Sequence, residues 1–465
     1  MLFIAYKMTK KNIISHIALR MILATTSALI LWSCSTFPDY ELYIEGFTDS
    51  RPTSPGTERE SSPFRDKVFI MYSMGYNNLS KDLNTNIDEL LSGNIPSFRQ
   101  DDDAILIFNH ASHNHTSDYT IPTSPVLYHA YKMNDGSVRR DTLAIYEPGS
   151  NSASKEMLRD VLTLIHERFP ANHYGMLVSS HATGWAPEKY CYNPPDKSSN
   201  GSWMAKQNFF KPLDIYVDEN PLTRSIGAHY IGRGSILSNI YEIDLIDFVD
   251  AIPFHMDYMI FDCCLMGCIE VAYQLRNKCD KVCFSQTEIL SQGMDYLTMS
   301  SHLFDNDEVN IEGIAYDYYS RYAEKPDLNK RSATISVVDC QKLDAVADVI
   351  KRNGAVINVL SGSGNRSKVQ RYYRSSYAVQ HGIFYDLEDI LLESNAENSE
   401  KEALKRAIDD CIICKYATPT FLTSLKIEHH SGLSMYLIDP ERTALNKYYT
   451  TLDWNKATGL IPETE

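Results

Sequence analysis

Short apolar runs that alternate with amphipathic helices dominate the sequence between residues 67 and 285. Each run is typical of a strand buried on both faces, and the five runs are 67–72, 104–108, 174–180, 258–261 and 281–285. Between them, the segment 151–169 repeats its apolar residues with a helical period at Leu158, Val161 and Leu162. Continuous apolar strands separated by helices predict an α/β/α sandwich around a mostly parallel central sheet.

Three other segments complete the predicted organisation. Asn239 and Glu242 stand three residues apart before an apolar run, which favours a capped helix over 239–252. Residues 188–234 form a long irregular insert, and loops of that length are usually functional or mobile. The domain at 66–340 is followed by 341–465, which mixes helical and strand-like patterns and predicts a C-terminal α/β or helical subdomain.

The N-terminus has the pattern of an export signal. A basic stretch precedes the apolar run 21–31, which is too short to span a bilayer, so residues 1–33 are interpreted as a signal peptide. Leu31-Trp32-Ser33-Cys34 resembles a bacterial lipobox and predicts lipidation of Cys34, with a plain cleaved signal as the alternative. Residues 34–65 contain Pro- and Ser-rich stretches at 51–56 and 60–63, have few large apolar residues after Phe47, and predict a flexible tether.

Composition excludes some classes of protein. The formal charge is −16, and without residues 1–33, which carry four basic residues and no acid, it falls to about −20. An acidic chain is a poor candidate for nucleic-acid binding, which needs a basic face. Ten cysteines in 465 residues are also too few for a disulfide scaffold.

Reactive side chains follow two of the predicted strands. His181 comes after the strand at 174–180, and Cys264 comes after the strand at 258–261. Chemistry in open α/β sheets is found at the carboxyl ends of strands, where an imidazole near a thiol favours the nucleophilic thiolate. Asp262 lies two residues before Cys264, so both side chains are expected on the same face. On spacing alone, a buried inert cysteine and a hydrogen-bonded strand-end histidine are the more common interpretation.

The residues around this pair resemble the clostripain family of cysteine peptidases. Residues 262–266 read Asp-Cys-Cys-Leu-Met and are followed by Glu-Val-Ala at 270–272, while residues 181–185 read His-Ala-Thr-Gly-Trp. Both are similar to the family's nucleophile and histidine motifs, in the same order, and the likeness extends over roughly residues 67 to 454. The resemblance implies a caspase-like fold and peptidase activity without a metal or organic cofactor.

The resemblance also implies residue roles. Cys264 would be the nucleophile and His181 the general acid/base, with the backbone amides of Cys264 and Ala182 holding the oxyanion. Asp262 would bind an Arg or Lys side chain before the scissile bond (the P1 position). Since the family's Gly-x-Gly-Trp run is altered at 291–296, a second acidic contact is expected from Asp295, or from Glu288 in its place.

Other departures from the family pattern affect the motifs themselves. Ala182 replaces a glycine, which would cost strain if a glycine-like conformation were needed there. Cys263 places a second thiol beside the nucleophile, and strand alternation predicts that it turns into the sheet.

The resemblance gives the long insert a function. Members of the family are often activated by cleavage after the histidine strand, and six basic residues here are candidate self-processing sites: Lys189, Lys197, Lys206, Lys211, Arg224 and Arg233. The alternative is an ordinary solvated loop.

Several further motifs have simpler explanations. Cys411 and Cys414 form a lone CxxC in a segment predicted as helical, where packing is more common than zinc or redox chemistry. His110, His113 and His115, and the pair 429–430, are predicted to be surface loop histidines, and Asp101–Asp103 a solvated turn.

The leading hypothesis is therefore an exported, lipid-anchored cysteine endopeptidase, periplasmic or on the cell surface. We expect it to act as a monomer on peptides or proteins with basic residues. The alternative is a catalytically silent surface lipoprotein of the same fold that binds protein or peptide.

Overall fold

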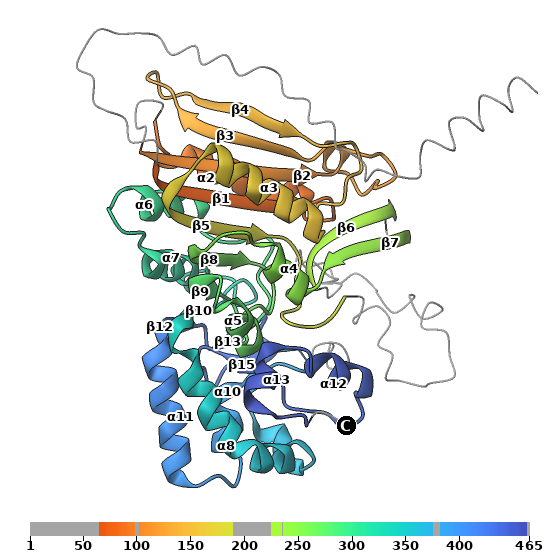
Figure 1. Ribbon diagram of the computed structural model, residues 1–465, viewed down its shortest axis with the longest axis vertical. Coiled ribbons are helices and arrows are strands. Elements are labelled where there is room, and N and C mark those ends of the chain that lie inside the picture. The colour runs from red at the N-terminus through yellow and green to blue at the C-terminus, as the bar shows by residue number, and fades with distance from the viewer. Residues whose placement is uncertain (1–64, 98–101, 189–224, 235, 375–381, 463–465) are drawn as a thin grey trace, which may run out of the picture. The chain divides into compact units, whose positions relative to one another are not determined.

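The computed structural model describes residues 65–97, 102–188, 225–234, 236–374 and 382–462 (Figure 1). Cys34, the predicted tether up to residue 64, and Asp101 lie outside these ranges. Within them, no helix combines the length and the apolar character needed to cross a membrane.

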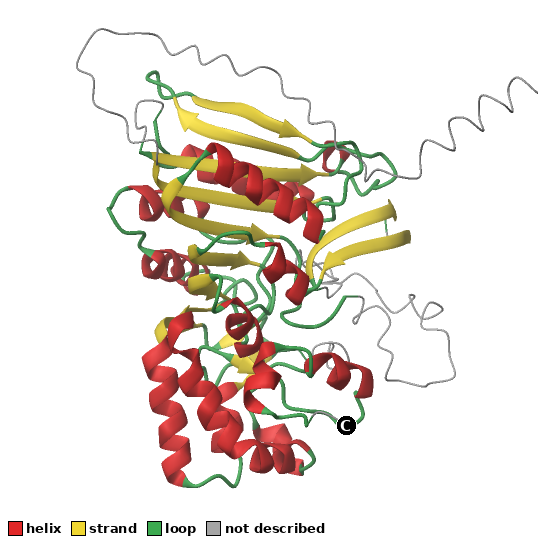
Figure 2. Cartoon of the chain, in the orientation of Figure 1, coloured by secondary structure: helices red, strands yellow, loops and turns green. Residues whose placement is uncertain are grey.

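A nine-stranded sheet runs through the molecule, in the order β12-β10-β9-β8-β5-β1-β2-β3-β4 (Figures 1 and 2). Its strands are β1 (Arg65–Gly75), β2 (Asp103–Ala111), β3 (Val126–Lys132), β4 (Val138–Ile145), β5 (Ala171–Ser179), β8 (Met256–Asp262), β9 (Cys279–Phe284), β10 (Thr334–Asp339) and β12 (Ile412–Ala417). The five strands β9, β8, β5, β1 and β2 are parallel to one another, and the pairings outside them, β9 with β10, β10 with β12, β2 with β3 and β3 with β4, are antiparallel. The predicted α/β class with a mostly parallel sheet is confirmed.

Strand alternation divides the core into two clusters on opposite faces of the sheet. In β1, Val68 and Ile70 belong to one cluster, while Phe69 and Met71 belong to the other. The first face is covered by α3 (Lys155–Arg168), α4 (Leu245–Ala251) and α5 (Ile269–Leu275). The second face is covered by α2 (Ser80–Ser92), α6 (Tyr296–Phe304) and α7 (Ile311–Ala323). The parallel strands are long apolar runs because both of their faces are buried.

The C-terminal part shares the central sheet. It contains α8 (Leu343–Ser361), α10 (Leu387–Leu392), α11 (Asn398–Cys411), α12 (Thr443–Tyr449) and α13 (Asp453–Thr458), with the short strands β11 (Tyr385–Asp386), β13 (Thr420–Phe421), β14 (Leu425–Lys426) and β15 (Ser434–Met435). Its strand β12 pairs with β10 at the edge of the nine-stranded sheet. The boundary at residue 340 stays a prediction, but the segment beyond it completes the main sheet.

One predicted helix begins later than expected. Asn239 and Glu242 lie on β7 (Ile236–Ile243), which pairs with β6 (Ile226–Arg233), so the prediction of a helix from residue 239 is wrong. The cap is Asp244, whose carboxylate accepts a hydrogen bond from the Ile246 backbone at 3.0 Å at the start of α4. Pairing between β6 and β7 therefore outweighed the local capping pattern. Because β6 lies at the end of the 188–234 insert, the last part of the insert is a β-strand and not an irregular loop.

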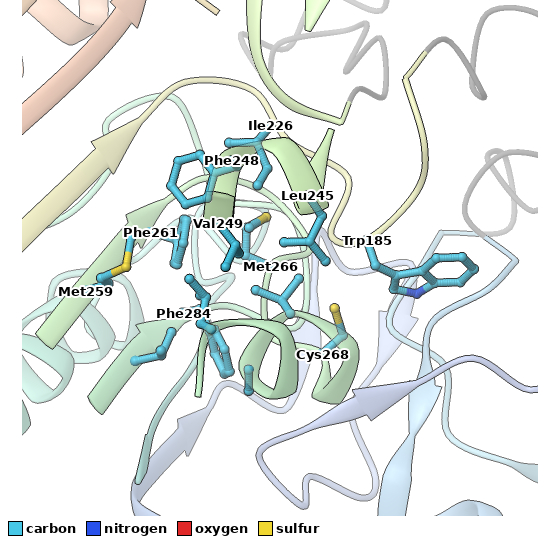
Figure 3. Close-up of a cluster of buried hydrophobic side chains, with 14 of the residues drawn as sticks. Trp185, Ile226, Leu245, Phe248, Val249, Met259, Phe261, Met266, Cys268 and Phe284 are labelled. Atoms are coloured by element: carbon cyan, nitrogen blue, oxygen red, sulfur yellow. The ribbon is translucent and has the colours of Figure 1, made fainter. Parts of the chain in front are cut away.

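A dense apolar cluster fixes the segment that follows β5. Trp185 is fully buried and joins the first core cluster together with Phe248, Phe261 and Met266 (Figure 3). The cluster anchors the turn after His181 to the same helices that pack on β8.

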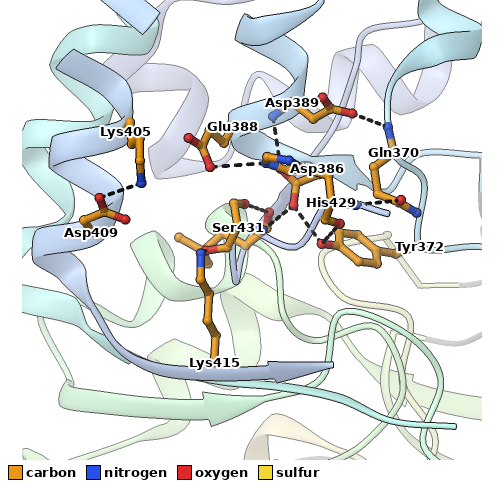
Figure 4. A network of polar contacts seen from close by, with 11 residues as sticks. Gln370, Tyr372, Asp386, Glu388, Asp389, Lys405, Asp409, Lys415, His429 and Ser431 are labelled. Carbon is orange, nitrogen blue, oxygen red and sulfur yellow. Dashed lines mark hydrogen bonds and ion pairs between the residues drawn. The ribbon is translucent and has the colours of Figure 1, made fainter. Parts of the chain in front are cut away.

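Polar contacts hold the C-terminal segments together (Figure 4). Asp386 is fully buried and accepts hydrogen bonds from the Tyr372 hydroxyl and the Ser431 backbone, both at 2.7 Å. His429 lies 3.2 Å from Glu388, which raises the pKa of the imidazole. The pair 429–430 is thus part of a packed network rather than the predicted surface loop.

Two other expectations about side chains are corrected. His110 is buried on β2, with Nδ1 2.9 Å from the Ser152 hydroxyl, and burial lowers its pKa to about 3; only His113 and His115 are exposed. Cys414 lies on β12, because α11 ends at Cys411, so the CxxC is not helical throughout.

Candidate active site

The carboxyl ends of four neighbouring parallel strands deliver the candidate side chains to one edge of the sheet. Along the strand order β1, β5, β8 and β9, the residues that follow the strand ends are Asn78, His181, Cys264 and Glu288. Parallel strands end at the same edge, so residues far apart in sequence meet there. The edge gathers an amide, an imidazole, a thiol and a carboxylate.

His181 and Cys264 occupy matched positions on adjacent strands. Ser179 of β5 pairs in parallel with Asp262 of β8, and each candidate lies two residues beyond that pair. Both side chains line the same pocket, which also contains Ser180 and Asp262. The approach of the two residues, expected from strand topology, is therefore supported by the register.

The two adjacent thiols lie at the start of a tight turn and have different surroundings. Leu265, directly after Cys264, has φ of 61°, an uncommon conformation for a residue with a side chain, and its N–H donates to Thr287 O at 2.9 Å. Cys264 is half-buried, and its Sγ lies 3.3 Å from the Ile289 backbone nitrogen. Cys263 is buried in the core and its Sγ faces Val178 O at 3.4 Å. Burial raises the pKa of the Cys263 thiol well above its usual value, so this thiol stays neutral.

An asparagine that sequence reasoning did not assign orients His181. The His181 Nε2 lies 2.9 Å from Asn78 Oδ1, and the same oxygen accepts from the Tyr230 hydroxyl at 3.0 Å. With this oxygen as acceptor, Nε2 carries the proton and Nδ1 is the basic nitrogen of the ring. The only sequence signal was the position of Asn78, just beyond the first strand.

In the turn after His181, the residue with the left-handed backbone that favours glycine is Gly184. Gly184 has φ of 55°, and a Cβ there would lie 2.7 Å from Leu265 O, so the turn after His181 packs directly on the turn after Cys264. Ala182 is buried and is not among the positive-φ residues in the described ranges. The strain considered for Ala182 therefore does not arise from a left-handed backbone.

Asp262 forms the buried carboxylate of the pocket. Its Oδ2 accepts hydrogen bonds from the Tyr296 hydroxyl at 2.5 Å and from the Ser179 hydroxyl at 3.2 Å. Burial raises the pKa of Asp262 to about 6, and the two hydrogen bonds only partly oppose this effect. Gly293 has φ of 61°, and a Cβ there would lie 2.5 Å from Asp262 Oδ2, so only glycine fits beside this carboxylate.

The two candidates for a second acidic contact occupy different places. Asp295 caps α6 by accepting from the Thr298 backbone at 3.4 Å, lies 3.8 Å from Arg321, and is not among the residues that line the pocket. Glu288 is buried, lines the pocket, and forms an ion pair with Arg374 at 2.7 Å.

Most of the candidate processing sites fall outside the described ranges, namely Lys189, Lys197, Lys206, Lys211 and Arg224. Arg233 lies at the end of β6 and forms an ion pair with Asp118 at 2.9 Å. In the described part of the chain, no three or more His, Cys, Asp or Glu side chains are grouped so that they could hold a metal ion.

Known structures share this fold over most of the chain. An inactive zymogen of a C11 protease from Parabacteroides distasonis matches with a TM-score of 0.65 and 23% identity, covering 86% of this chain and 99% of that chain. A secreted C11 cysteine protease from Bacteroides thetaiotaomicron matches with a TM-score of 0.63 and 22% identity, covering 86% and 100%. A complex of such a protease from the same organism with an irreversible peptide inhibitor gives a TM-score of 0.64 and 22% identity, covering 85% and 99%. No match was found among curated proteins.

A caspase-like sheet that carries a cysteine and a histidine at adjoining strand ends is the arrangement of a cysteine-type peptidase, and this is the class of the protein. Residues 238–460 match the model of the clostripain family, Peptidase_C11. The matched range includes Cys264 but begins after His181.

Proposed function

We propose that the protein is an endopeptidase in which Cys264 is the nucleophile and His181 the general acid/base. The observation that carries this proposal is the register of β5 and β8, which brings both side chains into one pocket. The Cys264 thiolate would attack the peptide carbonyl, and His181 would protonate the leaving amine as the C–N bond breaks. Water, deprotonated by His181, would then hydrolyse the thioester and release the thiol.

Backbone amides would stabilise the oxyanion formed in each step. The N–H of Cys264 lies at the nucleophile itself, and that of Ala182 lies in the turn packed against it through Gly184 and Leu265. Such donors act strongly because the site is partly withdrawn from water.

A preference for Arg or Lys at P1 is proposed from the buried carboxylate of Asp262, which lies in the pocket two residues before the nucleophile. A charge-assisted contact with a guanidinium or ammonium group would balance a carboxylate that is otherwise costly to ionise. Asp295 lies outside this pocket, so it does not contribute to the proposed contact.

We also propose export, lipidation at Cys34 and activation by cleavage within the 188–234 insert. The sequence patterns described above support these three proposals. The secreted relative from Bacteroides thetaiotaomicron supports export. If Cys34 carries the lipid anchor, the unmutated protein should incorporate labelled palmitate and the Cys34→Ala variant should not. Equal labelling of the variant would exclude Cys34 as the lipidated residue.

The activity is tested with three forms of the full-length protein: unmutated, Cys264→Ala and the matched control Cys263→Ala. Fluorogenic peptides ending in Arg or Lys are offered under reducing conditions, before and after limited proteolysis of the insert. We expect cleavage by the unmutated protein and by Cys263→Ala, and none by Cys264→Ala. Loss of activity only in Cys263→Ala would contradict the assignment of the nucleophile. An inert unmutated protein, even after proteolysis, would favour a silent binding protein of the same fold.

A further inference from the structure

The acidic side chain of Glu288 is already paired within the chain. The Arg374 guanidinium contacts both carboxylate oxygens, with Nε 3.0 Å from Oε2 and Nη2 2.7 Å from Oε1. The side chains are 7% exposed for Glu288 and 16% exposed for Arg374. A bidentate pair with little exposure is held more firmly than an ion pair on the surface.

This pair lies inside the candidate active site. Glu288 and Arg374 line the pocket that contains Asp262 and Cys264. Glu288 also directly precedes Ile289, whose backbone nitrogen is 3.3 Å from the Cys264 sulfur. The Arg374 guanidinium is therefore already paired with the Glu288 carboxylate, close to the nucleophile.

The charges that line the pocket are balanced. Asp262 and Glu288 are its acidic lining residues, and Lys330 and Arg374 are its lysine and arginine. A pocket with two unopposed carboxylates would attract a basic side chain strongly, whereas this lining has no excess of negative charge.

We propose that Arg374 is a specificity-determining residue, which engages Glu288 and leaves Asp262 as the carboxylate available to a basic P1 side chain. The proposal rests on the proposed peptidase function. Selectivity for Arg or Lys over an uncharged P1 residue is then weaker than two carboxylates would give. Removing the Arg374 charge should expose Glu288 to the substrate and increase this selectivity.

A purely structural role for Arg374 predicts a different result. In that case its loss would reduce cleavage of all substrates to a similar extent, because the whole pocket would be disturbed. The two roles are separated by the ratio of kcat/KM between substrates that differ only at P1.

The experiment compares Arg374→Gln, Glu288→Gln and the double variant on peptides that carry Arg, Lys or norleucine at P1. Arg276→Gln is the matched control, because Arg276 forms a comparable ion pair, 3.0 Å from Asp453, and has a side chain 23% exposed. We expect Arg374→Gln to raise the Arg-to-norleucine ratio about tenfold or more. Glu288→Gln alone should change the ratio less than about twofold, since its charge is already engaged, and should abolish the gain in the double variant.

Three outcomes would overturn the proposal: an unchanged ratio in Arg374→Gln, a collapse of the ratio in Glu288→Gln alone, or an equal gain in Arg276→Gln. Thermal unfolding identifies a variant that fails to fold, and Arg374→Lys, which keeps the charge, should stay close to the unmutated ratio. Calorimetric binding of benzamidine in a Cys264→Ala background separates this proposal from the peptidase function. Tighter binding with Arg374→Gln supports the pairing even if no peptide is cleaved, and unchanged binding refutes it.

Discussion

Asp262→Asn tests the electrostatic account of the pocket most directly. Burial raises the pKa of Asp262 from 3.8 to about 6 in the folded protein. A rise of this size corresponds to about 3 kcal/mol of preference for the neutral carboxyl. Because the folded-state pKa is the higher one, the unfolding free energy has its full value below pH 3.8 and falls as the pH rises through about 6.

The asparagine variant cannot ionise and does not suffer this loss. Its unfolding free energy, relative to that of the unmutated protein, should increase by about 3 kcal/mol from low pH to pH 8, with about half of the change between pH 5 and 7.5. The hydroxyls of Tyr296 and Ser179 can still donate to the amide oxygen, so the folded contacts are retained. The variant should nevertheless lose its preference for Arg at P1.

Urea unfolding followed by tryptophan fluorescence provides the measurement, in a Cys264→Ala background that prevents self-cleavage. Asp135→Asn, in an exposed turn, is the control: hydrogen bonds from Ser137 lower the pKa of this carboxyl, so the control variant should not gain stability as the pH rises. In the active protein, cleavage after Arg should rise as the pH passes about 6, where Asp262 ionises. A stability difference that is constant from pH 4.5 to 8 would refute the reasoning, as would undiminished selectivity for Arg in the variant.

Three further predictions concern the surroundings of the site. Gly293→Ala should destabilise the fold by about 1 to 3 kcal/mol and impair cleavage after Arg, because its Cβ would strike a buried carboxylate; Gly136→Ala, with φ of 81° but open space, should cost only backbone strain. Asn78→Ala should lower kcat about tenfold or more with little change in KM, because the acceptor of the His181 proton is removed. Glu270, buried on α5, has its pKa raised by burial to about 7, so stability is lost as the pH rises through that value; Glu270→Gln should flatten the stability profile between pH 5 and 8.

Each of these predictions has a distinct contrary result. Equal melting temperatures for the two alanine variants would show that the space beside Gly293 is not restricted. Unchanged kcat in Asn78→Ala would remove it as a positioning residue. An unaltered pH profile of urea unfolding in Glu270→Gln would show that this carboxyl does not titrate with unfolding.

Much of the fold could be predicted because the parallel strands are buried on both faces. Their continuous apolar runs, such as those of β1 and β8, are visible without any tertiary information. The antiparallel strands β3 and β4 were not predicted, since β4 is mostly exposed and lacks a strong apolar run. The hairpin strand β7 was interpreted as the start of a helix, because the short capping pattern of Asn239 and Glu242 carries no information about a strand partner.

The site divides in the same way. Strand-end motifs were enough to select His181, Cys264 and Asp262 as candidates. The roles of Asn78 and Arg374 depend on contacts between distant segments, with sequence separations of 103 residues for Asn78 to His181 and 86 for Arg374 to Glu288. No local pattern encodes a partner at that distance.

The sequence by itself predicted the α/β class and placed a thiol and an imidazole after strand ends, because these follow from hydrophobic period and residue type. The choice of Cys264 and His181 as candidates came from the resemblance to the clostripain family. Tertiary structure alone decided which strands are neighbours and how the charges of the pocket are paired. Strand register sets the positions of His181 and Cys264, and burial sets the pKa of Asp262. Both are properties of packing between segments, so they exist only when the chain has folded.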